Sequence, residues 1–263
     1  MKILKRLKIY WLYWLKHSSM SFQTLIATRL ASALFMSGKL IRFFFFFWFL
    51  LVLKTRITLI RGYSFDQLII FFLVFNLFDL IPQFFFRGIY WFRQDIISGT
   101  FDFKLVKPIS PLFNALTKHT DFLDLPILLL VIIMLITRIP TISPLGLFHF
   151  TLLSIASLLS ITAIHIIVAS IGVITTEVDH TIWIFRDLAA MGRMPVDIYV
   201  DFIRAFLTFI VPIALIFTVP AKALFGLLSL KVIIFSLIAS VFIYSFSLLF
   251  WRYALTKYSS ASS

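Results

Sequence analysis

The sequence predicts an all-α integral membrane protein, with six transmembrane helices preceded by an amphipathic helix at the membrane surface. The first observation is composition: 61% of the 263 residues are hydrophobic and 13% are charged. A soluble domain is about half apolar and about a quarter charged. The second observation is spacing, because apolar runs long enough to cross the hydrocarbon core recur along the chain.

The charge distribution indicates lipid rather than nucleic acid as a partner. The formal net charge is +13, and the basic residues lie between apolar runs, where anionic headgroups are the expected partners. There is no cysteine, which excludes disulfides and thiolate metal sites. The first apolar stretch holds Lys8 and Lys16 and lacks a small-residue cleavage site, so we expect insertion without cleavage.

Residues 1–31 predict a cytoplasmic helix lying in the headgroup layer. Aromatic residues favour the interface and basic residues favour anionic lipid. Here they alternate: Lys2, Lys5, Arg6, Lys8, Tyr10, Trp11, Tyr13, Trp14 and Lys16. The alternative is a solvated tail, in which so many aromatic side chains would be costly in water.

Six apolar stretches are candidate spans. In chain order they are 32–53, 65–86, 122–136, 145–174, 198–219 and 232–253. Basic residues are more frequent in the segments that are inside if the N-terminus is cytoplasmic, although Lys54, Arg56 and Arg61 oppose this trend. We therefore expect both termini inside, with inner loops at 87–121 and 175–197, and no separate soluble domain in residues 1–263.

Few residues suggest chemistry. Gly occurs 8 times, without the G-x-x-x-x-G-K pattern of a phosphate-binding loop. Glu177, Asp179 and His180 lie together, and their spacing favours a solvated loop over a metal site. Asp79 and His165 lie in apolar sequence, where an ionisable residue is either functional or, for the histidine, neutral and bonded to a neighbouring helix. No metal site or catalytic arrangement is expected.

Lys39 and Arg42 share a helix face in the first span. Two interpretations remain open for this pair. Both side chains either line a pathway or reach lipid phosphates by extending toward the membrane surface.

The stretch "ISGTFDFKLVKPISPLF", residues 97–113, separates two apolar regions. The preceding residues from Arg93 predict a short helix that ends near Gly99, since Gly commonly follows a helix end. Pro108 and Pro111 then stop regular structure. Such a braced, charged loop suits docking of another protein, and the alternative is a simple connection between helices.

Three blocks of this chain resemble one family of bacterial permeases. They are "ISGTFDFKLVKPISPLF", "MGRMPVDIYVDFIRAFLTFIVPIALIFTVPAKALFG" and the C-terminal "WRYALTKYSSASS". Their order and spacing are similar to those of the type-two ATP-binding-cassette exporter permeases, in the uncharacterised transport-system branch. Met194 stands where a tyrosine is commoner.

The resemblance implies an exporter permease fold, a single permease domain and a bacterial cytoplasmic (inner) membrane location. ATP and Mg²⁺ would be bound by separate ATPase subunits, with no cofactor in this chain, and a second permease chain, identical or paralogous, would complete the pathway. The loop 87–121 would couple to the ATPase, through Arg93, Asp95, Gly99, Asp102, Lys104, Lys107, Pro108 and Pro111. A broken helix near the exit would be shaped by Pro212, Pro220 and Ala221. The competing interpretations are an intramembrane lipid-modifying enzyme and a non-transporting assembly subunit.

Overall fold

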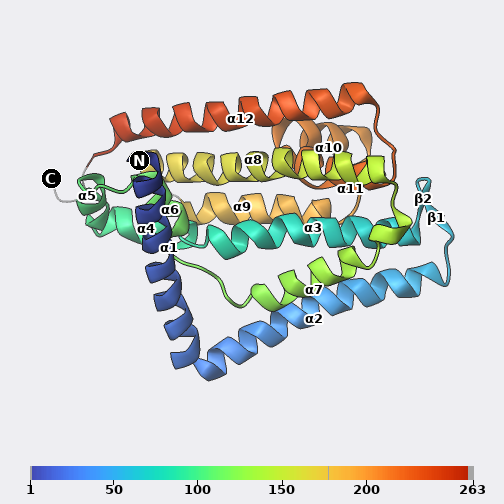
Figure 1. Ribbon diagram of the computed structural model, residues 1–263, viewed down its shortest axis with the longest axis horizontal. Helices are drawn as coiled ribbons and strands as arrows, with labels where there is room; N and C mark the ends of the chain where they lie inside the picture. The colour runs from blue at the N-terminus through green and yellow to red at the C-terminus, as the bar shows by residue number, and fades with distance from the viewer. Residues whose placement is uncertain (1, 177, 260–263) are drawn as a thin grey trace.

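The computed structural model describes residues 2–176 and 178–259, which are mainly helical (Figure 1). The first half contains α1 (Lys2–Ala27), α2 (Arg29–Lys54), β1 (Leu59–Ile60), β2 (Tyr63–Ser64), α3 (Phe65–Phe85), α4 (Ile89–Ile97), α5 (Thr100–Leu105), α6 (Pro111–Thr117) and α7 (Leu125–Ile136). The second half contains η1 (Ile139–Thr141), α8 (Pro144–Thr175), α9 (Val178–Ala190), η2 (Met191–Arg193), η3 (Val196–Ile198), α10 (Asp201–Ala205), the π-helical turns η4 (Phe206–Ile210) and η5 (Ala214–Thr218), α11 (Val219–Leu224) and α12 (Leu230–Lys257).

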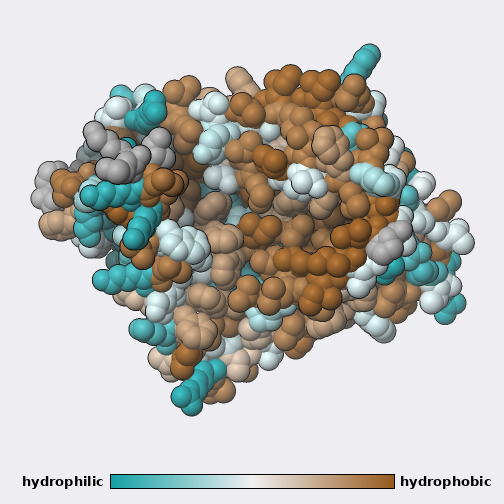
Figure 2. All heavy atoms as spheres, viewed as in Figure 1, coloured by the Kyte–Doolittle hydropathy of each residue, from teal (hydrophilic) through white to brown (hydrophobic). Residues whose placement is uncertain are grey.

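The long helices run side by side, and the two ends of this bundle differ (Figure 1). At one end, which we call the loop end, residues 88–122 form α4, α5, α6 and their connections, and α1 crosses beside them. At the other, the hairpin end, lie β1, β2, α10 and α11. Apolar side chains cover much of the middle of the visible face, and hydrophilic residues gather toward both ends (Figure 2). This distribution is typical of a membrane-spanning bundle.

Four predicted spans are confirmed as long apolar helices. The helical stretches Arg29–Lys54, Phe65–Ile97, Pro144–Thr175 and Leu230–Lys257 are each long and apolar enough to cross a membrane. The third predicted span, 122–136, forms only the 12-residue helix α7, which is shorter than a crossing requires.

The fifth predicted span, 198–219, is not one continuous helix, as its prolines lead one to expect. The chain instead forms two helical segments, Asp201–Ile210 and Ala214–Leu224, bent by 83°. Pro212 lies at the break, where it offers no backbone N–H to continue a helix.

The segment 175–197, predicted as an inner loop, contains the helix α9. Its residues Val178, Ile182, Phe185 and Ala189 are buried in the main core, and α9 packs against α8 and α4. The opposite face of α9 carries charges, which lowered the apparent apolarity of the segment. A hydropathy criterion therefore overlooks α9, although its periodicity is that of a half-buried helix.

Local signals explain where α3 begins. Leu59–Ile60 and Tyr63–Ser64 pair as a two-residue hairpin, in which Arg61 and Gly62 have φ angles of 49° and 85°. The Ser64 hydroxyl then accepts a hydrogen bond from the Gln67 backbone N–H, and the Gln67 side chain accepts one from Ser64 N–H. This reciprocal cap fixes the first turn of α3.

Small residues are buried in α8 and α12, which pack against each other. Ser157, Ser160, Ser236 and Ser240 are buried along these two helices. Serine side chains allow backbones to approach closely in membrane bundles. The hydroxyl of Ser157 also donates to the Leu153 carbonyl at 2.9 Å, so burial leaves that group satisfied.

Helix α1 is fixed to the loop end by side-chain hydrogen bonds. The Tyr10 hydroxyl accepts from the Ser110 N–H at 3.0 Å, and Ser18 and Thr120 share a hydrogen bond of 2.7 Å. Leu4, Leu7 and other large apolar side chains of α1 are exposed. An amphipathic helix with an exposed apolar face is consistent with the predicted interfacial position, which remains a prediction.

Candidate functional site

The backbone of the loop end is compact and turns sharply at two glycines. Gly99 has a φ of 69° and follows α4, as the sequence predicts, although α4 begins earlier than expected, at Ile89. Gly88 donates its N–H to the Leu116 carbonyl at 3.0 Å. A Cβ atom at Gly88 would lie 2.5 Å from the Ala115 carbonyl oxygen, so only Gly fits where α4 and α6 meet.

A buried carboxylate organises the charges of the loop end. The Asp95 side chain is 8% exposed and lies between two ammonium groups, forming ion pairs with Lys104 and, at 2.8 Å, with Lys118. Burial opposes ionisation of Asp95, but the hydrogen bonds and charges of both lysines outweigh it and hold its pKa below the ordinary value. The cluster joins α4, α5 and the end of α6 into one unit.

Arg93 and Asp102 connect this unit to other helices. The Arg93 Nε–H donates to the Thr176 carbonyl at 3.1 Å, beside the start of α9. The Tyr258 hydroxyl, just after α12, donates to Asp102 Oδ1 at 2.8 Å. Burial and the Asp102 charge raise the pKa of Tyr258 to about 12, so this hydroxyl stays protonated as a donor.

The predicted coupling residues therefore separate into two groups. Asp95 and Lys104 are enclosed, Arg93 and Asp102 have internal partners, Gly99 shapes the turn, and Pro111 starts α6 after the capping residue Ser110. Lys107 and Pro108 are exposed. The structure thus places all eight residues in one unit but leaves few of their side chains facing outward.

The two most exposed large apolar side chains of this unit were not singled out from the sequence. Phe103 is 69% exposed and Val106 is 83% exposed. The alternation in "TFDFKLV" resembles a strand, yet the segment forms α5, and helical spacing puts positions 103 and 106 on the same side. Helical periodicity would have been the signal for this apolar pair.

The hairpin end holds the predicted broken helix. Pro212 lies at the 83° bend, and Pro220 and Ala221 are buried in α11. Asp197 ties this element to the hairpin, because its Oδ2 atom is 2.7 Å from Lys222 Nζ and accepts a 2.8 Å hydrogen bond from the Tyr63 hydroxyl. The expectation of a helix broken near prolines is confirmed.

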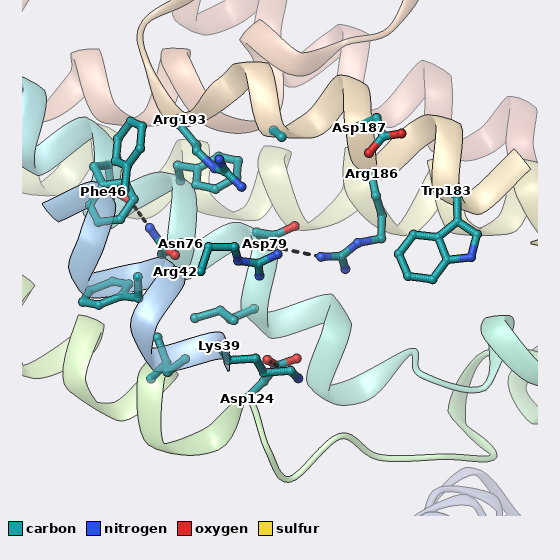
Figure 3. Close-up of a pocket in the computed structure, with 16 residues that line it drawn as sticks. Lys39, Arg42, Phe46, Asn76, Asp79, Asp124, Trp183, Arg186, Asp187 and Arg193 are labelled. Atoms are coloured by element: carbon teal, nitrogen blue, oxygen red, sulfur yellow. Dashed lines mark hydrogen bonds and ion pairs between the residues drawn. The ribbon is translucent and has the colours of Figure 1, made fainter. Parts of the chain in front are cut away.

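A polar pocket of about 150 Å³ lies between α2, α3, α7 and α9 (Figure 3). Asp79 lines it and faces Arg186 of α9 at 4.0 Å. Lys39 lies at its edge and pairs with Asp121 and Asp124 at 2.9 and 2.7 Å. Sequence analysis had singled out Asp79 and Lys39 but not the pairs that they form.

His165 is fully buried in α8, between the rings of Phe86 and Phe185. Its Nδ1 is 2.8 Å from the Ile161 carbonyl, which can only accept, so the proton resides on Nδ1. The partner is thus the histidine's own helix rather than a neighbouring one. Nε2 has no hydrogen-bond partner within the described part of the chain.

Candidate metal ligands are scattered over the described part of the chain. In residues 2–176 and 178–259, no group of three or more His, Cys, Asp or Glu side chains could hold a metal ion. Asp179 belongs to α9 and lies 3.9 Å from Arg93, rather than in a solvated loop. Glu177, which the sequence groups with Asp179 and His180, lies outside the described residues.

Comparison with known proteins gives one match. No curated protein and no solved structure matches this chain. The family described as "ABC-2 family transporter protein" matches residues 40–262, a range that contains the loop end, the bent helix pair and the C-terminal helix. That family is a membrane transport component and is not itself catalytic. With most of its length matched and its long apolar helices, the chain is a multi-pass membrane protein that belongs to the ABC-2 transporter family.

Proposed function

We propose that this chain is the permease subunit of an ATP-binding-cassette exporter, which forms the substrate pathway and couples to a separate ATPase. The observation that carries the proposal is the loop end, where Phe103 and Val106 are exposed on a unit whose buried charges are paired internally. Exposed apolar side chains on a rigid support are the usual centre of a protein interface. ATP and Mg²⁺ belong to the ATPase in this proposal.

The contacts of the loop end suggest how motion would pass to the bundle. Phe101 packs against Trp251 and Tyr258 of the α12 end, with ring centroids 6.5 and 5.1 Å apart. Arg93 reaches the turn between α8 and α9. A displacement of the docking surface would therefore reach α8, α9 and α12 together, with the free energy supplied by the ATPase cycle.

The remaining assembly follows the same proposal. A second permease chain, identical or paralogous, would cover apolar faces such as that of α2, where Phe44, Phe45 and Trp48 are exposed. The bent helix pair would shape the exit of the pathway. The loop end, α1 and the end of α12 share one end of the molecule, which we assign to the cytoplasmic side of a bacterial inner membrane.

Purification of the tagged chain from native membranes, followed by mass spectrometry of co-purifying proteins, tests the partner. Recovery of an ATP-binding-cassette ATPase is expected. Recovery of the chain without any ATPase would contradict the proposal and leave the loop end as a connection between helices.

The docking surface is tested by Phe103→Ser with Val106→Ser in the purified complex. Because both side chains are exposed, we expect loss of ATPase recovery with little change in thermal stability. The matched control is Leu227→Ser, which changes an exposed residue at the hairpin end. ATPase recovery and turnover equal to the control would refute the assignment of this surface. These variants test docking more directly than changes at Asp102 and Lys104. Both of those residues have internal contacts, so their substitution does not separate lost docking from altered folding.

A further inference from the structure

The pocket between α2, α3 and α9 contains two arginines whose charges are not balanced by a carboxylate. Arg42 comes from the middle of α2 and Arg193 from η2, after α9. Ion pairs near the pocket engage Lys39 and Arg186. Within residues 2–176 and 178–259, neither Arg42 nor Arg193 has a carboxylate oxygen within 4.0 Å, and neither donates a hydrogen bond.

The charges around these arginines leave an excess of positive charge. The Lys39 contacts with Asp121 and Asp124, together with Arg87 at 3.5 Å from Asp121, form a balanced group of two cations and two carboxylates. The rest of the lining has Arg42, Arg186 and Arg193 opposite Asp79 and Asp187. Arg42 and Asp187 are both exposed, whereas Arg186 and Arg193 are half-buried. Three arginines against two aspartates leave this part of the lining with one net positive charge.

The position of Arg42 makes this excess of positive charge unfavourable in free energy. α2 is one of the four helices apolar enough to cross a membrane, and Arg42 lies halfway along it. An unpaired charge at such a position is unfavourable and usually has a functional partner. Figure 3 shows the Arg42 and Arg186 side chains directed into the same space below Arg193. Like charges brought together in an apolar layer favour an added anion.

The geometry of the pocket suits a phosphate-sized group with an apolar body. Its volume of about 150 Å³ is roughly ten times what a single buried water needs. Arg193 lies over the rings of Phe46 and Phe75, at 5.7 and 5.9 Å from their centroids, which supports the guanidinium and leaves its edge N–H groups available. Phe43, Phe72 and Trp183 supply further apolar walls.

We propose that this pocket binds the phosphate or a similar anionic group of an amphiphilic molecule, held by the guanidinium groups of Arg42 and Arg193. Bidentate contacts from arginine are well matched to phosphate oxygens. The aromatic walls contact the apolar part of the same molecule. This site is a property of the chain itself and does not depend on coupling to an ATPase.

The test is a binding titration on the full-length protein in an uncharged detergent, read as a shift in the thermal unfolding midpoint. The probes are dihexanoyl phosphatidylglycerol, dihexanoyl phosphatidylcholine and inorganic phosphate. We expect saturable stabilisation by phosphatidylglycerol, and a Kd about tenfold or more higher in Arg42→Gln and in Arg193→Gln. Arg252→Gln, which changes an exposed arginine near the end of α12, controls for general attraction between lipid and basic residues.

The probes distinguish the source of the anion. Stabilisation by phosphatidylglycerol alone identifies a lipid headgroup, and equal stabilisation by inorganic phosphate identifies a free anion site. Wild-type affinity for both anionic probes in the double variant Arg42→Gln/Arg193→Gln would overturn the proposal, as would equal binding of phosphatidylcholine.

Misfolding of a variant is separable from loss of the site. Because Gln removes an unbalanced charge from an apolar layer, the lipid-free double variant should unfold at the wild-type temperature or above it. Arg42→Lys keeps the charge without the bidentate geometry, so we expect intermediate affinity. A lipid-free double variant that unfolds well below the wild type would show that the arginines support the fold instead.

Discussion

The loop end and the polar pocket both concentrate charged side chains, but only at the loop end is each charge of the cluster in direct contact with an opposite charge. At the loop end, Lys104 and Lys118 enclose the Asp95 carboxylate. Arg42 and Arg193 both line the pocket. Among the described residues, no carboxylate oxygen lies within 4.0 Å of either guanidinium group. The charges around Asp95 are paired by direct contacts, whereas the half-buried Arg193 and the exposed Arg42 are not.

The difference separates a structural role from a binding role. In a cluster of paired charges, such as the one around Asp95, removal of one member destabilises the protein, because the remaining charges stay buried without a partner. In a cluster of unpaired like charges, such as Arg42 and Arg193, removal of one member is tolerated, because it relieves repulsion between the charges. The two roles thus predict opposite signs for the same kind of substitution.

The largest expected effect compares Lys39 with Arg42, two cations one helical turn apart on α2. Lys39→Gln leaves Asp124 unpaired and Asp121 with only the longer contact to Arg87. We expect a loss of about 3 kcal/mol of stability, the typical result of breaking a buried pair. Arg42→Gln should cost less than about 0.5 kcal/mol.

Thermal unfolding of both variants in the same lipid-free detergent measures this difference. Equal destabilisation by the two substitutions would contradict the inference that Lys39 is a paired charge and Arg42 an unpaired one.

A smaller loss is expected at the loop end. Asp95→Ala leaves two lysines, but Lys118 is 25% exposed and can turn toward water. We therefore expect a loss of about 2 kcal/mol, compared with less than about 0.5 kcal/mol for Lys107→Ala on the exposed surface of the same loop. Denaturant unfolding of the pair is the measurement, and similar values for both would show that Asp95 does not organise this unit.

Steric fit provides an independent check of the same unit. Gly88→Ala places a Cβ atom against the carbonyl oxygens of Ala115 and Leu116, both of which belong to α6. Backbone must move to relieve this overlap, so we expect a loss of about 1 to 2 kcal/mol. Gly38→Ala, whose Cβ would meet nothing within 4 Å, should be neutral or slightly stabilising. Limited proteolysis of the loop end would locate the disturbance.

Sequence reasoning identified the elements that depend on local composition. α2, α3, α8 and α12 are long apolar runs, and Gly99 and Pro212 act through backbone preferences that any context preserves. α9 was missed because its charges find partners on other elements, such as Asp79 for Arg186. The broken helix was expected from its prolines, but hydropathy does not show where it breaks, because Asp201–Ile210 and Ala214–Leu224 are both apolar.

The pairing of charges could not be predicted from the sequence. Lys39 and Asp121 are 82 positions apart, and Asp102 and Tyr258 are 156 apart. Such contacts follow from the packing of whole helices, which residue spacing does not encode. For the same reason, the sequence did not show that Asp95 and Lys104, two of the predicted coupling residues, are enclosed rather than directed outward.

The smallest expected effect is a pH dependence at the loop end. Burial, with the nearby Lys118 charge, lowers the pKa of His119 to about 4, and the same causes lower the pKa of His17 on α1. An unfolded histidine has a pKa of about 6.5. Between these values the unfolded state binds more protons, so stability falls as the pH decreases from about 6.5 toward about 4.

The Asp95 carboxyl affects stability in an adjacent, more acidic pH range. Its folded pKa is depressed, so its contribution is present above the unfolded value of about 3.9 and is lost below it.

Unfolding midpoints measured from pH 7 to pH 4.5 therefore isolate the histidines. We expect a smaller slope in His119→Gln and a still smaller one in His17→Gln/His119→Gln. An unchanged slope in the double variant would mean that neither histidine is held neutral by the packing of α1 on the loop end. The packing of α1 on the loop end would then be looser than the hydrogen bonds of Tyr10 and Ser18 indicate. The stability of the loop end would in that case depend on the ion pairs of Asp95.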